Sequence, residues 1–95
     1  MAVYSVANVG VTDPDRYAEY RDKVPATVAA YGGKYLARGG TLEVLEGDWD
    51  PQSLTILEFE SMERFHKWYN SPEYAPLKQL RIETAVTEYV LVEGL

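Results

Sequence analysis

Three short segments of the chain are rich in β-branched and aromatic residues. They are Val3–Val9 (VYSVANV), Leu54–Phe59 (LTILEF) and Val86–Val92 (VTEYVLV). Runs of this length and composition are typical of β-strands. The pattern therefore predicts one strand at each end of the chain and a third in its middle.

The region before Leu54 also alternates between polar and apolar residues. Lys34–Arg38 (KYLAR) and Thr41–Glu46 (TLEVLE) are separated by Gly39-Gly40, and Gly47–Gln52 (GDWDPQ) has the composition of a turn. Two adjacent glycines inside a strand pattern favour a bulge or a sharp bend. We expect one bent strand over residues 34–46 that pairs as a hairpin with the strand beginning at Leu54.

A helix is predicted after the first strand. Asp13 followed by Pro14 is a helix start, because the carboxylate accepts hydrogen bonds from the first turn and proline suits the first helical position. An apolar stripe at spacings of three and four follows and ends before Gly32-Gly33: Tyr17, Tyr20, Val24, Val28 and Tyr31. Pro25 lies inside this helix, where it costs about 3 kcal/mol, so we expect a kink or a break there.

A second helical region follows the third strand. Ser61 is a predicted cap, and Met62, Phe65 and Tyr69 lie on one side of the helix behind it. Ser71-Pro72 repeats the start signal. It begins a further helical stretch in which four residues align: Tyr74, Leu77, Arg81 and Ala85.

The predicted order is strand, helix, strand, strand, helix, strand. Over residues 1–95 this indicates a single α+β domain of the ferredoxin-like βαββαβ type, with a four-stranded antiparallel sheet. The strands are apolar on both faces, whereas the helices can cover only one. An uncovered apolar face predicts a homodimer through the sheet faces. The alternative is that the sheet twists and its long tyrosines shield the open face.

Composition narrows the range of partners. Fifteen acidic against nine basic residues give a formal charge of −6, which disfavours nucleic acid and anionic membrane surfaces. There is no cysteine, so neither a disulfide nor a thiolate metal site can form. The N-terminal residues have neither a basic start nor a long apolar run, and a cytoplasmic location is expected.

Several short motifs occur in order along nearly the whole chain. They are Tyr31-Gly32-Gly33-Lys34-Tyr35, Arg38-Gly39-Gly40, Glu46-Gly47 with Trp49, Glu58-Phe59-Glu60-Ser61, Trp68-Tyr69-Asn70-Ser71-Pro72-Glu73-Tyr74, and Arg81. Together they resemble the family known as domain of unknown function 1330, a branch of the dimeric α+β barrel superfamily. The resemblance implies the fold and dimer given above. The wider superfamily includes cofactor-independent monooxygenases, lactone isomerases and haem enzymes, which implies small-molecule chemistry by analogy only.

Arg38 is the first candidate for a functional residue. It stands beside two glycines, where a ligand can approach closely, and a guanidinium can hold a carboxylate or enolate through two parallel hydrogen bonds. The structural alternative is an ion pair between Arg38 and Glu46 or Glu58 that fixes the bend. Glu46 is a candidate general base and Trp49 a candidate wall for an apolar ligand. Both can equally be structural, with Glu46 bonded to its own turn and Trp49 packed over a sheet edge.

Three residues around the second helical region complete the candidate site. Tyr69 is a candidate proton donor, and Tyr74 and Arg81, seven residues apart on one helical face, are candidate ligand-binding residues. Core packing is their alternative role. The single histidine, His66, lies off the buried stripe, and no metal-ligand cluster is present, so neither metal nor cofactor is expected.

The sequence leaves two functions open. In the first, the chain is a cofactor-independent enzyme for a small carbonyl-bearing or anionic molecule. Arg38 then binds the anion, Tyr69 or Tyr74 orients it and Glu46 moves a proton. In the second, the chain is a non-catalytic homodimer, structural or small-ligand-binding, and the same residues stabilise the bend and the interface. The substrate, the reaction and the sharing of the site between subunits are not fixed by the sequence.

Overall fold

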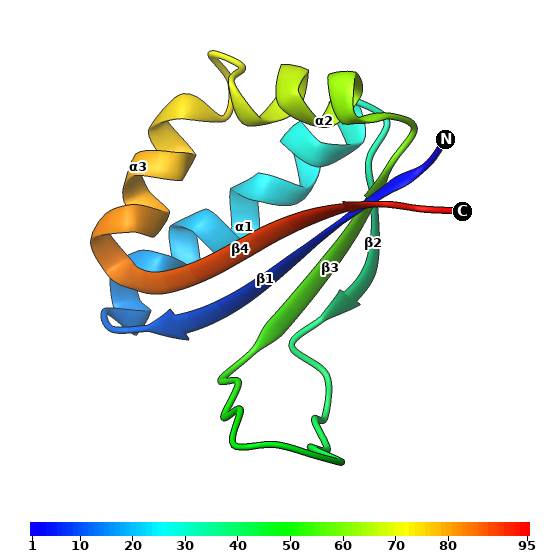
Figure 1. Ribbon diagram of the computed structural model, residues 1–95. Coiled ribbons are helices and arrows are strands. Elements are labelled where there is room, and N and C mark those ends of the chain that lie inside the picture. Colours follow the sequence, from blue (N-terminus) through cyan, green and yellow to red (C-terminus); the bar gives the residue numbers. More distant parts are fainter.

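The computed structural model describes residues 1–95 as a four-stranded sheet with three helices on one of its faces (Figure 1). The strands are antiparallel to their neighbours in the order β2-β3-β1-β4. The elements in chain order are β1 (Val3–Val11), α1 (Pro14–Ala30), β2 (Lys34–Arg38), β3 (Leu54–Phe59), α2 (Met62–Tyr69), α3 (Ala75–Thr84) and β4 (Ala85–Glu93). This is the predicted ferredoxin-like βαββαβ arrangement, with the second helical region divided in two.

The helices begin at the residues that the sequence marks. The Asp13 carboxylate accepts a hydrogen bond from the Arg16 amide at 3.3 Å, and Ser61 Oγ accepts one from the Arg64 amide at 3.1 Å. On α2 the buried residues are Phe65 and Trp68, whereas Met62, which was expected on the buried side, is exposed. The last residue of the predicted stripe on α3, Ala85, instead begins β4.

Helix α1 continues without interruption through Pro25, so the predicted break is absent. Proline has no N–H, and the carbonyl of Arg21, four residues earlier, therefore lacks its helical donor. The Arg38 guanidinium donates a hydrogen bond to this carbonyl at 2.5 Å. A side chain from the sheet thus supplies the donor that the helix lacks.

The predicted strand over Thr41–Glu46 is wrong. Strand β2 ends at Arg38, and residues 39–53 form a largely exposed loop, called here the β2–β3 loop, that extends away from the sheet (Figure 1). Because β3 begins only at Leu54, the alternating segment has no strand within its own chain to pair with. The bend at Gly39, whose φ is +68°, is where the chain leaves the sheet. The bulge lies earlier, between Tyr35 and Ala37, and not at Gly39-Gly40.

The core lies between the sheet and the helices. Its largest fully buried side chains include Phe59 from β3, Trp68 from α2 and Tyr74 from the turn before α3. The Phe59 and Trp68 rings stack with centroids 5.5 Å apart. Trp68 also donates a hydrogen bond from Nε1 to Thr27 Oγ1 at 3.0 Å, which ties α2 to α1.

The sheet face away from the helices, called here the open face, is largely apolar. Val6 and Ile56 lie opposite each other in its middle, and the outer strand β4 adds Val86, Val90 and Val92, all exposed. The apolar character of both sheet faces is therefore confirmed. No helix of the structure is long and apolar enough to cross a membrane.

Substituting Gly33→Ala tests the packing where α1 meets the sheet. A Cβ atom there would lie 2.6 Å from Phe59 Cζ and 2.7 Å from Val28 Cγ1, both in the tight core. We expect the free energy of unfolding to fall by about 1–3 kcal/mol, measured by denaturant titration. Gly40→Ala is the control, because its Cβ meets nothing within 4 Å and should cost little. Equal effects of the two substitutions would contradict this packing.

Candidate functional site

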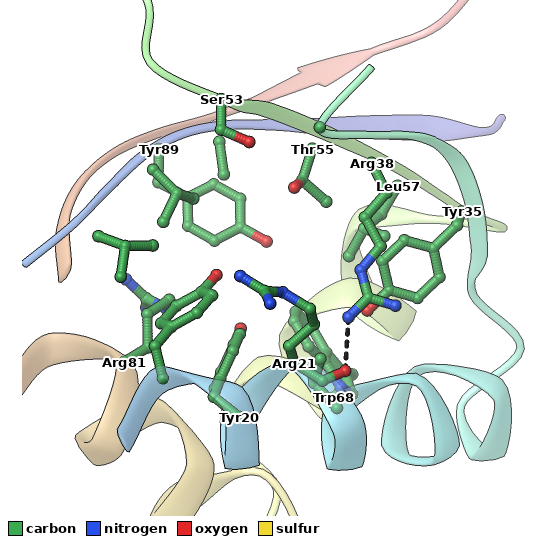
Figure 2. Close-up of a pocket in the computed structure, with 16 residues that line it drawn as sticks. Tyr20, Arg21, Tyr35, Arg38, Ser53, Thr55, Leu57, Trp68, Arg81 and Tyr89 are labelled. Carbon is green, nitrogen blue, oxygen red and sulfur yellow. Dashed lines mark hydrogen bonds between the residues drawn. The ribbon is translucent and has the colours of Figure 1, made fainter. Parts of the chain in front are cut away.

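A pocket of about 330 Å³ lies between α1 and the helix-covered face of the sheet. Its ionisable lining consists of three arginines and four tyrosines, and it includes no aspartate, glutamate, lysine or histidine: Arg21, Arg38, Arg81, Tyr17, Tyr20, Tyr35 and Tyr89. Figure 2 shows the hydroxyls of Tyr20 and Tyr89 and the guanidinium of Arg21 pointing into the same space. The pocket is therefore cationic and rich in hydrogen-bond donors.

The bulge in β2 directs two of these side chains into the pocket. Residues three apart on a regular strand face opposite sides, because side chains alternate. Here Tyr35 pairs with Leu57 and Arg38 pairs with Thr55, and the extra residue between Tyr35 and Ala37 restores a common face. Both side chains consequently line the pocket.

Arg38 contacts backbone and ring atoms and no carboxylate. In addition to its bond with the Arg21 carbonyl, its guanidinium carbon lies 5.2 Å from the centre of the Tyr35 ring. It forms no ion pair with Glu46 or Glu58, so the structural alternative expected from the sequence is not formed. Arg38 links β2 to α1 at the rim of the pocket and keeps its remaining donors free.

Arg81 is the most deeply buried charge of the site. It projects from α3 with 6% of its surface exposed, and its Nε lies 3.4 Å from the Tyr74 hydroxyl. Its guanidinium carbon lies 5.7 Å from the centre of the Tyr89 ring, and no carboxylate lies within 4.0 Å of its nitrogens. A buried charge without a partner is costly, because water stabilises it only through the small surface that remains exposed.

The pocket tyrosines remain neutral at physiological pH. Burial raises the pKa of Tyr35 to about 12, and it also raises the pKa values of Tyr20 and Tyr89 above that of an exposed tyrosine. A phenol that stays protonated is a hydrogen-bond donor and not a base. The pocket can thus stabilise negative charge, but none of its own groups is poised to accept a proton.

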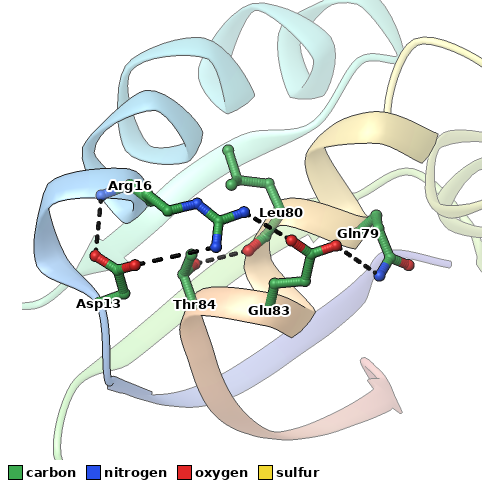
Figure 3. Close-up of polar contacts among 6 residues, drawn as sticks. All are labelled: Asp13, Arg16, Gln79, Leu80, Glu83 and Thr84. Carbon is green, nitrogen blue, oxygen red and sulfur yellow. Dashed lines mark hydrogen bonds and ion pairs between the residues drawn. The ribbon is translucent and has the colours of Figure 1, made fainter.

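A polar network outside the pocket holds α3 against α1 (Figure 3). Arg16 on α1 forms an ion pair of 2.7 Å with Glu83 on α3, and Gln79 donates a hydrogen bond to the same carboxylate at 3.0 Å. These side chains are exposed, so each contact contributes little on its own. The backbone amides of Thr12 and Asp13 both donate to the Thr84 carbonyl, and this fixes the end of the helix that carries Arg81.

The structure brings together only part of the predicted site. Arg38 and Arg81 line the pocket. Tyr74 lies directly behind it, and its hydroxyl is hydrogen-bonded to that of Tyr20. Glu46 is exposed on the β2–β3 loop and is not part of the lining.

Tyr69 and Trp49 also lie outside the pocket. Tyr69 is half-buried on α2, where Lys78 Nζ lies 4.1 Å from its ring centre. Trp49 belongs to a separate hollow on the open face, together with Val6 and Val90. Neither residue lines the arginine pocket, although the Tyr69 ring packs beside those of Tyr74 and Tyr89, with ring centres 6.0 Å apart in each pair.

Sequence reasoning missed Arg21, Tyr20, Tyr35 and Tyr89 as site residues. Arg21 had a detectable signal, because it lies four residues after Tyr17 on the apolar stripe, where a charge is unexpected. Tyr35 had none, since its direction depends on a bulge that the sequence did not locate. His66 is exposed, and no three metal-binding side chains come together in the fold.

The fold and the site define a class of protein: a ferredoxin-like α+β domain with a cationic, tyrosine-lined pocket between helix and sheet. The profile of the family described as "Domain of unknown function (DUF1330)" matches residues 2–95. The chain belongs to this family, as its motifs predict.

Solved structures share the fold. RPA0582, a protein of unknown function from Rhodopseudomonas palustris, is 19% identical, with 99% of this chain and 82% of that chain covered and a TM-score of 0.80. A dimeric ferredoxin-like protein of unknown function from Jannaschia is 11% identical (99% and 100% covered; TM-score 0.70). SnoaB, a cofactor-independent oxygenase from Streptomyces nogalater, is 14% identical (99% and 93% covered; TM-score 0.65). No curated protein matches the chain. Identities this low establish a common fold and no common activity.

Replacing Pro25 with alanine tests the link between α1 and Arg38. The substituted residue would supply the missing N–H to the Arg21 carbonyl, and we expect the free energy of unfolding to rise by about 1–2 kcal/mol. Pro76→Ala is the control, since proline is tolerated in the first turn of α3. Denaturant titration measures both changes.

Pro25 and Arg38 can be examined together in a double-mutant cycle. Arg38→Ala should cost about 1 kcal/mol in the native background and close to nothing after Pro25→Ala, because the carbonyl is then satisfied by the helix. Additive effects would contradict the compensation between Pro25 and Arg38.

Proposed function

We propose that the protein is a homodimer that binds a small anionic or carbonyl-bearing organic molecule in the arginine–tyrosine pocket and acts on it without a cofactor. The observation that carries this proposal is Arg81, a buried guanidinium with no carboxylate partner. A fold retains such a charge at a cost in stability when a ligand supplies the missing negative charge.

The size and walls of the pocket support a small planar ligand. A volume of about 330 Å³ is near the lower end of the range for small-molecule sites. Apolar side chains such as Val9, Leu57 and Trp68 form much of the wall beside the tyrosine rings. Flat walls and guanidinium groups suit a one- or two-ring molecule with an anionic substituent.

The chemistry that this lining favours is stabilisation of negative charge. Guanidinium groups and neutral phenols hold carboxylates, enolates and phenolates, and in a buried site they do so more strongly than in water. The proposal assigns this role to Arg38 and Arg81. It assigns no part in ligand binding or catalysis to Glu46, Tyr69 or Trp49, which lie outside the pocket of their own chain.

Catalysis without a cofactor is supported by the fold alone. SnoaB, which has this fold, is a cofactor-independent oxygenase, so a domain of this shape is compatible with such chemistry. The alternative is a non-catalytic small-ligand-binding dimer. The specific observation that favours the alternative is that no residue in the pocket is poised to accept a proton.

The homodimer is supported by the open face and by the β2–β3 loop. Val86 and Val90 on the open face, and Leu45 and Trp49 on the loop, each expose more than half of their surface. Apolar patches of this kind usually mark an interface. A related protein from Jannaschia is described as dimeric, which favours a second copy of this chain as the partner. With its charge of −6 and no cysteine, the dimer is proposed to act in the cytoplasm without nucleic acid.

Arg81→Met separates a ligand-binding arginine from a structural one. By calorimetry, we expect the native protein to bind aromatic carboxylates such as salicylate more tightly than the matched carboxamides, and Arg81→Met to weaken carboxylate binding at least about tenfold. Its free energy of unfolding should stay the same or rise by about 1–2 kcal/mol, because an unpaired buried charge is removed.

The control for this test is Arg64→Met on the exposed surface of α2, which should change neither property. If Arg81→Met binds salicylate normally and is several kcal/mol less stable, the arginine is structural and the proposal fails.

Val90→Glu tests the homodimer. Val90 is 58% exposed on the open face, so a charge there is tolerated by a single chain but should disrupt a sheet-to-sheet interface. Ile82→Glu is a matched control on α3, where the native residue is 55% exposed. Sedimentation should give 21.4 kDa (2 × 10.7 kDa) for the native chain and the control, and 10.7 kDa for Val90→Glu. A native mass of 10.7 kDa would refute the dimer.

A further inference from the structure

Two tyrosine hydroxyls and one guanidinium form a chain behind the pocket. The hydroxyl oxygens of Tyr20 on α1 and Tyr74 before α3 lie 2.8 Å apart, and Arg81 Nε lies 3.4 Å from the Tyr74 oxygen. Tyr74 is completely buried. The proton between the two hydroxyls can belong to either of them, and its position decides what the chain offers to a ligand.

The guanidinium fixes the direction of this chain. It carries five N–H donors and no acceptor, so the Tyr74 oxygen must accept from Arg81. If Tyr74 also accepted from Tyr20, its own proton would be buried without an acceptor, which is unfavourable. The Tyr74 hydroxyl therefore donates to the Tyr20 oxygen.

The hydroxyl proton of Tyr20 is then left for the pocket. Tyr20 has no side-chain hydrogen bond other than the one with Tyr74, and its hydroxyl points into the space that it shares with the Arg21 guanidinium (Figure 2). Because burial raises the pKa of Tyr20, this hydroxyl keeps its proton at neutral pH. The chain from Arg81 through Tyr74 ends in one oriented donor.

We propose that Tyr20 holds the oxyanion of a bound phenol or enol, so that the pocket selects its ligand in the phenolate or enolate form. The inference rests on the proposed function for the existence of a ligand, and it names the ligand's chemical class. Tyr20 is the specificity-determining residue. Tyr74 does not line the pocket and is a positioning residue.

Phenolates and enolates fit the lining better than other anions. Both are planar and present a single charged oxygen, which matches one oriented hydroxyl between aromatic walls. Three guanidinium groups favour the ionised form, and no carboxylate in the lining opposes it. On binding, the O–H bond of the ligand breaks and its proton passes to solvent at the rim, where Arg21 and Arg38 are exposed.

The test uses 4-nitrophenol, whose anion absorbs visible light and whose ionisation lies near neutral pH. Titration of the native protein should show the apparent pKa of the bound probe lowered by at least one unit, which corresponds to about a tenfold preference for the anion. 4-Nitroanisole, which has nearly the same shape and no ionisable proton, should bind at least about tenfold more weakly than the anion.

Four variants assign the effect. Tyr20→Phe should reduce the preference for the anion about tenfold, and Tyr74→Phe should reduce it by a smaller factor, because the hydroxyl of Tyr20 then loses its orientation. The double variant Tyr20→Phe with Tyr74→Phe removes both hydroxyls, so no buried hydroxyl is left without a partner. It is used in place of Tyr20→Phe if that single variant does not fold. Tyr31→Phe removes a hydroxyl bonded to Glu73 away from the pocket, and it should behave as the native protein.

Parallel measurements with 4-nitrobenzoate separate this inference from the proposed function. Binding of 4-nitrophenol with an unshifted pKa, or an unchanged shift after Tyr20→Phe, would overturn the inference alone. Binding of 4-nitrobenzoate without any binding of 4-nitrophenol would have the same meaning. If none of the three probes binds to the native protein, both the inference and the proposed function fail.

Discussion

The guanidinium of Arg81 sits beneath the sheet without a carboxylate to neutralise it, and the rest of the site is arranged around that charge. Tyr74 accepts a hydrogen bond from it, and the Tyr89 ring presents its face to it. Neither group removes the charge. A core of this size contains little spare stability, so an unpaired buried cation is costly. The proposed anionic ligand offsets that cost.

Local departures from regular structure converge on the same pocket. Pro25 leaves a carbonyl of α1 without a donor, the bulge in β2 turns Arg38 onto the helix-covered face, and Arg38 then donates to that carbonyl. Each departure is unfavourable in isolation. Together they place a guanidinium at the rim of the pocket and connect the edge strand to the helix. Proteins commonly break local rules at functional sites and compensate for them nearby.

The sequence predicted the architecture well because its signals are local. The caps at Asp13 and Ser61, the apolar stripe of α1 and all four strands follow from periodicity and turn chemistry, although β2 ends at Arg38, and the two-sided apolar sheet was also foreseen. The predicted strand over Thr41–Glu46 was wrong. An alternating pattern indicates that a segment is able to form a strand, but it does not show that a neighbouring strand is available for pairing.

The site was predicted only in part, for reasons of geometry. Arg38 and Arg81 were identified by their chemistry, but Glu46 and Tyr69 were grouped with them without knowledge of where the loop and α2 would lie. Tyr35 and Tyr89 reach the pocket through the bulge and through strand pairing with β1, both of which depend on tertiary structure. The charge of Arg21 on an apolar stripe was the one overlooked signal that the sequence contained.

The central claim is that the charge of Arg81 is neutralised by a bound small anion. A crystal structure of the protein with 4-nitrophenolate tests it most directly. The account predicts the phenolate oxygen within hydrogen-bond distance of Tyr20, inside the pocket that Arg21, Arg38 and Arg81 line. The contradicting result is a probe bound elsewhere, with a carboxylate of the partner subunit paired with Arg81 in its place.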